Sequence, residues 1–369
     1  MTMKRHAENE RLKRRYLQFL REVKGRDEAS LDTVAKALER FDSYNRYRDL
    51  RKFHIEQAQA FKANLAEQRN VRSGKPLSAS TINSTLGALK AFFVWLAEQP
   101  GYSARIRYSD AEYFNPPENL ARVATAHRLK KYPTLEEIRK ALAAMPATTE
   151  IERRDRALLA FAILTGARDR AIVSFKLKHI DLKDELVLQD ARDVRTKRAK
   201  TFTTWFFPVG ADIQQIVAEW VTFLREEKGF GPEDPIFPKS RVAPGADRKF
   251  APVGLDRAHW ANAHPVRAAF KAAFERAGLA YYNPHSFRDT LVHLAYDLGL
   301  DAEKMKAWSQ NIGHEHILTT FSSYGSIAPH RQAEIIRGLA SEGAGNLQEF
   351  TPDMLRKLAE QMERAKKRG

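Results

Sequence analysis

Apolar residues recur every three to four positions in the first third of the chain, a spacing that predicts amphipathic helices. Leu12, Tyr16 and Leu20 share one face of a first helix and have basic residues around them. A second helix is expected after Ser78, a residue type that can cap a helix. Its apolar face consists of Ile82, Leu86, Leu89, Phe93 and Leu96. We therefore expect residues 1–113 to form a small helical bundle.

The helical pattern is interrupted over residues 114–131, where no clear period is present. The pair Pro116-Pro117 disfavours a helix because proline lacks an N–H group and has a fixed backbone angle. Thr134 and Glu137 then form a capping box, which is the sequence signature of a helix start. We therefore predict an interdomain linker over 114–131 and a second domain over 132–340.

The second domain combines helices with short runs typical of strands. The mostly apolar stretch Arg156–Thr165 predicts a buried helix. Leu186–Leu188 and Thr203–Phe207 are rich in β-forming residues and flank the basic stretch Arg192–Lys200. This arrangement predicts a small sheet with a basic hairpin.

Three further helices are expected in this domain. Pro265 and Gly278 bound one of them, as a first-turn proline and a glycine beyond the last turn. Two more are expected near residues 286–298 and 302–311. The predicted fold class is therefore mainly α with a small β-sheet, an α+β arrangement.

The end of the chain carries a separate helix signal over residues 341–369. Ser341–Asn346 predicts a flexible break, after which Thr351 can cap a helix that Pro352 opens. A narrow apolar stripe follows on that helix, made of Met354, Leu358 and Met362. Such a stripe can dock on a neighbouring subunit or on the chain's own body, and both alternatives stay open.

The charge of the chain adds a class of partner to this picture. Lys and Arg number 62 against 46 Asp and Glu, which gives a net charge of +16 and a pI of about 9.8. Such an excess favours a polyanionic partner, usually nucleic acid, although a basic protein without such a partner is the alternative. We predict that Asn83, Ser84 and Lys90, on the polar face of the second helix, contact DNA; the alternative is an ordinary solvated face.

Several classes of site are excluded or disfavoured by composition. The chain has no cysteine, which excludes disulfides, cysteine-based zinc sites and thiol nucleophiles and is consistent with a reducing cytosol. Its first residues lack the apolar run of a signal peptide. No stretch approaches the ~18 apolar residues of a membrane span.

Six residues between positions 168 and 324 have the chemistry needed to cut and rejoin a phosphodiester. They are Arg168 (after Thr165-Gly166-Ala167), Lys197 (in Thr196-Lys197-Arg198), His285 and Arg288 (in His285-Ser286-Phe287-Arg288), His314 (after Ile312-Gly313) and Tyr324. Each short motif is a weak signal by itself. Their order and spacing along one chain are a much stronger one.

Each residue type suits a definite part of such a reaction. Arg168 and Arg288 can each donate paired hydrogen bonds to the charged phosphate oxygens. The phenol of Tyr324 is a candidate nucleophile, and His285 can take its proton. Lys197, on the basic hairpin, can protonate the leaving 5′ oxygen, and His314 can hydrogen-bond the phosphate. No metal is required, because the cations of the protein supply the electrostatic stabilisation.

The set in this order resembles the tyrosine recombinase (phage integrase) family over roughly residues 130–330. The resemblance implies a helical core-binding domain, a linker and a catalytic domain that together clamp DNA. It implies attack by Tyr324 to give a 3′-phosphotyrosine and a free 5′-hydroxyl, without ATP, metal or other cofactor. Family members act as tetramers on two duplexes and commonly pass a C-terminal segment to a neighbour. Arg195, Arg198 and Lys200 on the hairpin are further predicted DNA contacts.

The chain departs from the family pattern at two positions. The family usually has a glutamate three residues after the first arginine, where this chain has Ala171, with Asp169 nearby. The tyrosine usually follows the last histidine by nine residues, whereas Tyr324 is the tenth residue after His314. One extra residue in that turn is tolerable, and the local support of Arg168 is left open.

We therefore expect a site-specific recombinase that acts on double-stranded DNA as a homotetramer. Accessory or directionality factors, a mobile-element context and a cytoplasmic, nucleoid-associated location are part of this expectation. The alternatives are a DNA-binding accessory protein without catalysis and a nicking-closing enzyme like the type IB topoisomerases. A metal-dependent nuclease is a further alternative, since His314-Glu315-His316 hints at a metal, but no carboxylate cluster accompanies it.

Overall fold

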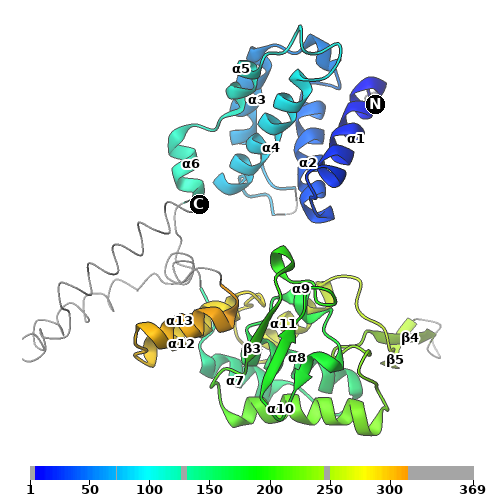
Figure 1. Cartoon of the computed structure of the whole chain (residues 1–369), viewed down its shortest axis with the longest axis vertical. Coiled ribbons are helices and arrows are strands. Elements are labelled where there is room, and N and C mark those ends of the chain that lie inside the picture. Colours follow the sequence, from blue (N-terminus) through cyan, green and yellow to red (C-terminus); the bar gives the residue numbers. More distant parts are fainter. Residues whose placement is uncertain (1–4, 72, 126–130, 245–249, 315–369) are drawn as a thin grey trace, which may run out of the picture. The chain divides into compact units, whose positions relative to one another are not determined.

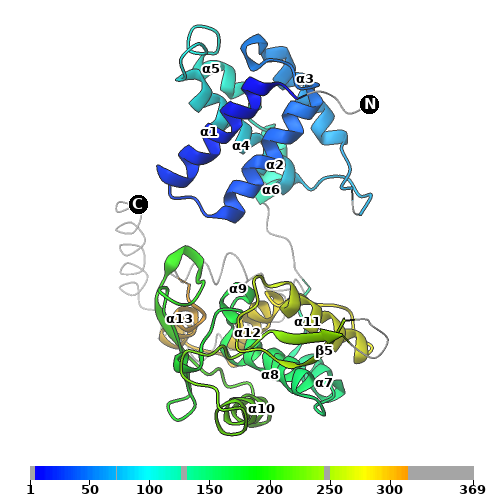
Figure 2. The same cartoon turned by 90° about the vertical axis from the view of Figure 1, so that its right-hand side faces the viewer.

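A computed structural model describes residues 5–71, 73–125, 131–244 and 250–314 (Figures 1 and 2). The chain divides into two compact units, Met1–Ala126 and His127–Gly369. Tyr324 and the predicted break and helix at 341–369 lie outside the described residues.

The first unit is a bundle of helices, as predicted. Its elements are α1 (Ala7–Glu22), α2 (Glu28–Tyr44), η1 (Leu50–Lys52), α3 (Ile55–Glu67), α4 (Ala79–Ala97), α5 (Tyr108–Ala111), η2 (Glu112–Phe114) and α6 (Glu118–Thr125). The expected face of α1 is buried, and Ser78 caps α4 by accepting a hydrogen bond from the Thr81 N–H at 3.1 Å. Aromatic rings fill the core, where Phe93 lies 5.4 Å from Phe41 and 4.8 Å from Phe114 between ring centroids.

The predicted linker over 114–131 differs from the structure in its middle part. Glu118–Thr125 forms helix α6, and Leu120 packs against the core of the first unit. The two prolines precede this helix, and proline at the start of a helix costs no hydrogen bond because the first N–H groups have no intrahelical acceptor. The pair Pro116-Pro117 therefore marks a helix start, and the described part of the first unit extends through Thr125.

In its described residues, the second unit combines helices with two antiparallel sheets. Its elements are α7 (Leu135–Ala144), α8 (Glu150–Thr165), α9 (Asp169–Ile172), η3 (Leu177–His179), β1 (Ile180–Asp181), β2 (Leu186–Gln189), η4 (Lys197–Ala199), β3 (Phe202–Trp205), α10 (Ala211–Thr222), η5 (Phe223–Glu227), β4 (Ser240–Pro244), β5 (Phe250–Leu255), α11 (His264–Arg276), α12 (Ser286–Asp297) and α13 (Ala302–Ile312). This content confirms the mainly α, α+β fold class.

The predicted helices and basic hairpin of this unit are present. The Thr134–Glu137 capping box starts α7, and α8 is buried along Ala157–Thr165. The three-stranded sheet has the order β1-β2-β3, with Val187 opposite Thr204. The second sheet, β4–β5, was not predicted from the sequence. Its burial pattern is mostly exposed, so it lacks the alternation of buried and exposed positions that reveals a strand.

Candidate functional site

Arg168 lies directly after a sharp end of helix α8. Gly166 has a φ of +59°, in the left-handed region that favours glycine, and it ends the helix there. The Thr165 hydroxyl donates to the Phe161 carbonyl at 2.7 Å and accepts from the Ala167 N–H at 3.3 Å. Arg168 then occupies the position before α9, half-buried, with its backbone extended. The turn thus fixes the backbone from which this guanidinium projects.

Arg288 is buried in the middle of the predicted set. The whole residue is only 1% exposed. Nη1 donates to the Gly166 carbonyl at 2.6 Å, and Nη2 donates to Nε2 of His314 at 3.0 Å. One guanidinium therefore joins the end of α8, the first turn of α12 and the residue two positions beyond α13.

The imidazole of His314 is neutral in this environment. Burial lowers its pKa to about 3, and the positive charges of Arg288, Arg168, His285 and Lys200 act in the same direction. Because a guanidinium only donates, Nε2 of His314 accepts from Arg288, and the proton of the neutral ring is on Nδ1. The one N–H of the His314 ring is therefore at Nδ1, and the hydrogen bond from Arg288 fixes the orientation of the ring.

His285 lies at the exposed edge of the same cluster. It occupies the position before α12, one turn away from Arg288, so the two side chains leave the helix on a common side. Its effect on the pKa of His314 places it near that ring. An exposed histidine at this position can exchange protons with a substrate, which buried His314 cannot do at neutral pH.

Lys197 lies on the loop between β2 and β3, within the short η4 turn. The next two residues, Arg198 and Ala199, have φ angles of 60° and 50°. Lys197 is exposed, whereas Lys200 is half-buried with its ammonium 5.6 Å from the centre of the Phe202 ring. Lys200 is also among the cations that lower the pKa of His314, so this loop carries two lysines that could act as the acid, at different depths.

The turn that carries His314 is attached to strand β3 by Asn311, a residue that the sequence did not single out. The Trp205 N–H donates to Oδ1 of Asn311 at 2.8 Å, and Nδ2 of Asn311 donates to the Trp205 carbonyl at 2.9 Å. The Thr204 hydroxyl donates to the Asn311 carbonyl at 3.0 Å. Asn311 thereby satisfies the edge of β3 as a neighbouring strand would. No motif marks an amide that pairs with a strand 106 residues away.

Two residues near Arg168, Ala171 and Asp169, bear on how its turn is supported. Ala171, where the family usually has a glutamate, is 1% exposed and has no carboxylate to offer. Asp169 accepts hydrogen bonds from Nε and Nη2 of Arg267 at 2.9 and 2.6 Å. Asp169 therefore ties α9 to α11.

The predicted DNA contacts lie on two elements. In the first unit, Ser84 is exposed on α4 and Asn83 is half-buried there. Lys90 pairs with Glu112 at 2.9 Å and donates to the Asn115 side chain at 3.0 Å. On the hairpin loop, Arg195 donates through Nη1 to the Ala261 carbonyl at 3.1 Å, and Arg198 is exposed. DNA contact by these residues stays a prediction.

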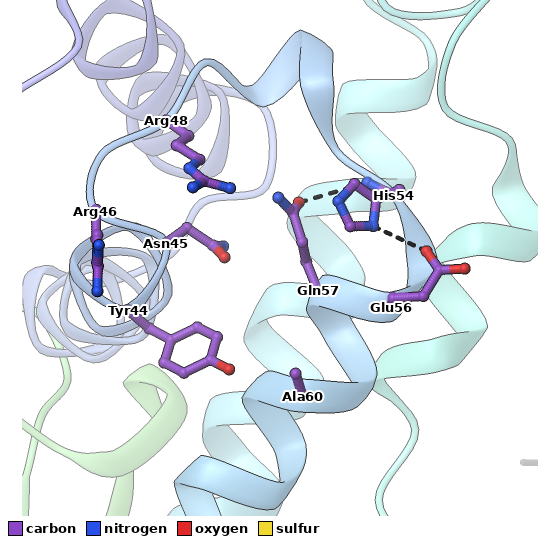
Figure 3. A pocket seen from close by; sticks show the side chains of 8 residues that line it. All are labelled: Tyr44, Asn45, Arg46, Arg48, His54, Glu56, Gln57 and Ala60. Atoms are coloured by element: carbon purple, nitrogen blue, oxygen red, sulfur yellow. Dashed lines mark hydrogen bonds and ion pairs between the residues drawn. The ribbon is translucent and has the colours of Figure 1, made fainter.

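A separate open hollow is present in the first unit, at the α2–α3 connection (Figure 3). It has a volume of about 360 Å³ and is lined by Tyr44, Asn45, Arg46, Arg48, His54, Glu56, Gln57 and Ala60. His54 and Glu56 share a hydrogen bond of 2.8 Å at its rim. None of the predicted catalytic residues lines this hollow.

The residues that the structure describes lack two further features. No group of three or more His, Cys, Asp or Glu side chains within these ranges is arranged to hold a metal ion. Within the same ranges, no helix has the length and apolar character needed to cross a membrane.

A family model and a known relative match this chain. The model of the phage integrase family matches residues 131–331. Tyrosine recombinase XerC of Escherichia coli O157:H7 is 24% identical over 251 residues, which are 67% of this chain and 70% of XerC.

Solved structures show the same fold. A lambda integrase tetramer bound to a Holliday junction matches with a TM-score of 0.53 and 15% identity, over 87% of this chain and 79% of that one. The Tn1549 transposon integrase in complex with transposon right end DNA matches with a TM-score of 0.53 and 13% identity, over 89% of this chain and 99% of that one.

Proposed function

The chain belongs to the phage integrase family and is a tyrosine-type site-specific recombinase, and we propose that it cuts and rejoins DNA through a covalent bond between Tyr324 and a 3′ phosphate. The observation that carries the proposal is the buried junction of Arg288, Gly166 and His314, with Arg168 and His285 beside it. These donors and cations suit one phosphate group.

Each member of the cluster has a distinct role in this mechanism. Arg168 and Arg288 hold the scissile phosphate, and the Nδ1–H of His314 donates to one of its oxygens. The phenol oxygen of Tyr324 attacks phosphorus while His285 accepts the phenol proton. The bond from phosphorus to the 5′ oxygen breaks, and Lys197 protonates that oxygen.

The cationic side chains of the site supply the electrostatic stabilisation that a metal ion supplies in other phosphoryl-transfer enzymes. Two guanidiniums and an ammonium stabilise the negative charge that develops on the phosphate oxygens. Rejoining is the reverse reaction, in which a 5′-hydroxyl attacks the phosphotyrosine. Because the link conserves the energy of the broken bond, no nucleotide or other cofactor is consumed.

The assembly and biological setting are also part of the proposal. We expect a homotetramer on two duplexes, since a lambda integrase with this fold is a tetramer on a Holliday junction. A role in integration or transposition of a mobile element fits the transposon integrase among the structural neighbours. Accessory factors and a nucleoid-associated, cytoplasmic location are expected with such a substrate.

The nucleophile is tested with a nicked suicide duplex that carries the recombination site. Tyr324→Phe removes only the phenol oxygen, so we expect DNA binding close to that of the parent and no covalent adduct on a denaturing gel. Ser323→Ala is the matched control and should form the adduct. A persistent adduct with Tyr324→Phe would refute the assignment of the nucleophile, and its loss with Ser323→Ala would point to the serine.

A further inference from the structure

The loop that carries Lys197 is attached to the body of the second unit on the side that precedes the lysine. Asp193 is four residues before Lys197, and its two carboxylate oxygens lie 2.7 Å from the ammonium groups of Lys176 and Lys178. Both lysines also pair with Glu233 at 2.9 Å. These pairs hold the pKa of the Asp193 carboxyl well below its usual range, so it is ionised at neutral pH.

A buried histidine, His179, lies against the same carboxylate. Nδ1 of His179 accepts a hydrogen bond from the Lys176 N–H at 2.9 Å, so the proton of the neutral ring is on Nε2. Burial lowers the pKa of His179, which keeps the ring neutral. Its Nε2 lies 3.5 Å from Oδ2 of Asp193, on the side of the carboxylate that Lys178 also faces.

A second attachment leads from the loop to the turn of Arg168. The Arg195 N–H donates to Oγ of Ser174 at 2.9 Å, and that hydroxyl donates to the Ala171 carbonyl at 2.9 Å. The Ala171 N–H in turn donates to the Arg168 carbonyl at 2.8 Å. Ser174 is 6% exposed, so these bonds are shielded from water. Three hydrogen bonds therefore link the backbone of Arg168 to a residue two positions before Lys197.

Beyond these attachments the loop changes character. Lys197, Arg198 and Ala199 are all exposed, and the last two have left-handed backbone angles. The loop is thus held by hydrogen bonds as far as Arg195 and is exposed to solvent from Lys197 to Ala199. Because the backbone before Lys197 is held, its ammonium group can occupy only a limited region, and its long side chain can still extend to the 5′ oxygen.

We propose that Asp193 and Ser174 are positioning residues that hold the Lys197 loop at a fixed place relative to Arg168. Lys197 can then protonate the 5′ oxygen of the same phosphodiester whose phosphate Arg168 and Arg288 bind. This inference rests on the proposed role of Lys197. Asp193 would not touch DNA itself. Its loss would release the loop and slow protonation of the leaving 5′ oxygen, while the hold on the phosphate by Arg168 and Arg288 would be kept.

Asp193→Asn is the first variant to test, because it keeps the shape of the side chain and removes its charge. Ser174→Ala is the second, and it removes the link to Ala171 without changing any charge. Asp184→Asn, in the exposed turn between β1 and β2, is the matched control. Lys197→Ala is the reference for loss of the acid itself.

The rate of covalent adduct formation is measured on two suicide substrates, one with the natural 5′ oxygen and one with sulfur in that bridging position. A thiolate leaves without protonation, so the rate on the sulfur substrate does not depend on the acid. A variant that is slow on the oxygen substrate alone therefore has a defect in protonation of the leaving group. DNA affinity is measured in parallel. These readouts separate a misplaced acid from general damage to the site.

We expect Asp193→Asn and Ser174→Ala to slow cleavage of the oxygen substrate by about tenfold, against ~10²–10⁴ for Lys197→Ala. Each should recover the parent rate on the sulfur substrate with unchanged DNA affinity, and Asp184→Asn should match the parent throughout. Parent rates for both loop variants, equal defects on both substrates, or a change in DNA affinity alone would overturn the inference. A Lys197→Ala variant without a defect would instead refute the role of Lys197, and the inference would fall with it.

Discussion

At the residue scale, Arg288 shows how a charge is kept inside this protein. A buried guanidinium is costly unless its N–H groups are satisfied, and here a carbonyl and a neutral imidazole accept from it. His314 can accept only because its pKa is low. Both residues could be predicted from short sequence motifs, but no motif indicates that Arg288 holds His314 in a single tautomer.

The neutral state of His314 leads to a prediction about its replacement. A glutamine can accept from Arg288 and donate to phosphate, so His314→Gln should cleave DNA within about tenfold of the parent. His285→Gln removes a group that exchanges protons and should slow cleavage by ~10²–10⁴. Single-turnover rates of adduct formation compare the two variants. Equal losses would show that His314 also transfers a proton.

His314 also makes the stability of the protein depend on pH. In the unfolded chain its ring takes up a proton near the ordinary value of about 6.5, whereas in the folded protein the pKa is about 3. The contribution of neutral His314 to the free energy of unfolding is therefore complete above the unfolded pKa. It is lost as the pH falls from there toward the folded pKa, because the unfolded chain then binds a proton that the folded protein does not. Urea denaturation across this range should give a shallower loss for His314→Gln than for the parent. Parallel curves would show that the pKa of this ring is the same in the folded and the unfolded chain.

At the element scale, the meeting of α13 with β3 decides where the His314 turn lies. Asn311 pairs with the edge of β3, and Gly313, with a φ of +85°, lies against the ring of Phe202. The helices and the β2–β3 hairpin could be predicted because their apolar and polar spacing is local. The partner of Asn311 could not, because it is distant in sequence and was chosen by the fold. Helix α6 was missed because a proline pair disfavours the interior of a helix but suits its start.

Gly313 gives the sharpest test of this junction. A Cβ there would lie 2.5 Å from Cζ of Phe202, and the backbone angle disfavours any side chain by about 1–2 kcal/mol. Gly313→Ala should therefore lower the free energy of unfolding by more than that backbone cost and slow cleavage. Gly278→Ala is the control, since its φ of +69° is similar and no atom lies within 4 Å of the added carbon. Equal losses of stability in the two variants would show that contact with Phe202 is unimportant.

At the scale of the whole molecule, the net charge of +16 indicates a chain that binds DNA largely through phosphates. Each phosphate neutralised by Lys or Arg releases counterions, so affinity should fall steeply as salt increases. A plot of log affinity against log salt concentration should be linear, with a slope that corresponds to several phosphate contacts. An affinity that does not change with salt would contradict a phosphate-dominated interface.

The central claim is tested most directly by identifying the residue that is joined to DNA. The protein is incubated with a suicide duplex in the presence of EDTA, the adduct is digested with trypsin, and the DNA-linked peptide is sequenced by mass spectrometry. We predict a single adduct, formed without metal, in which Tyr324 carries a 3′ phosphate. An adduct at another residue, a 5′ linkage, or cleavage that requires added Mg²⁺ and leaves no covalent link would contradict the account.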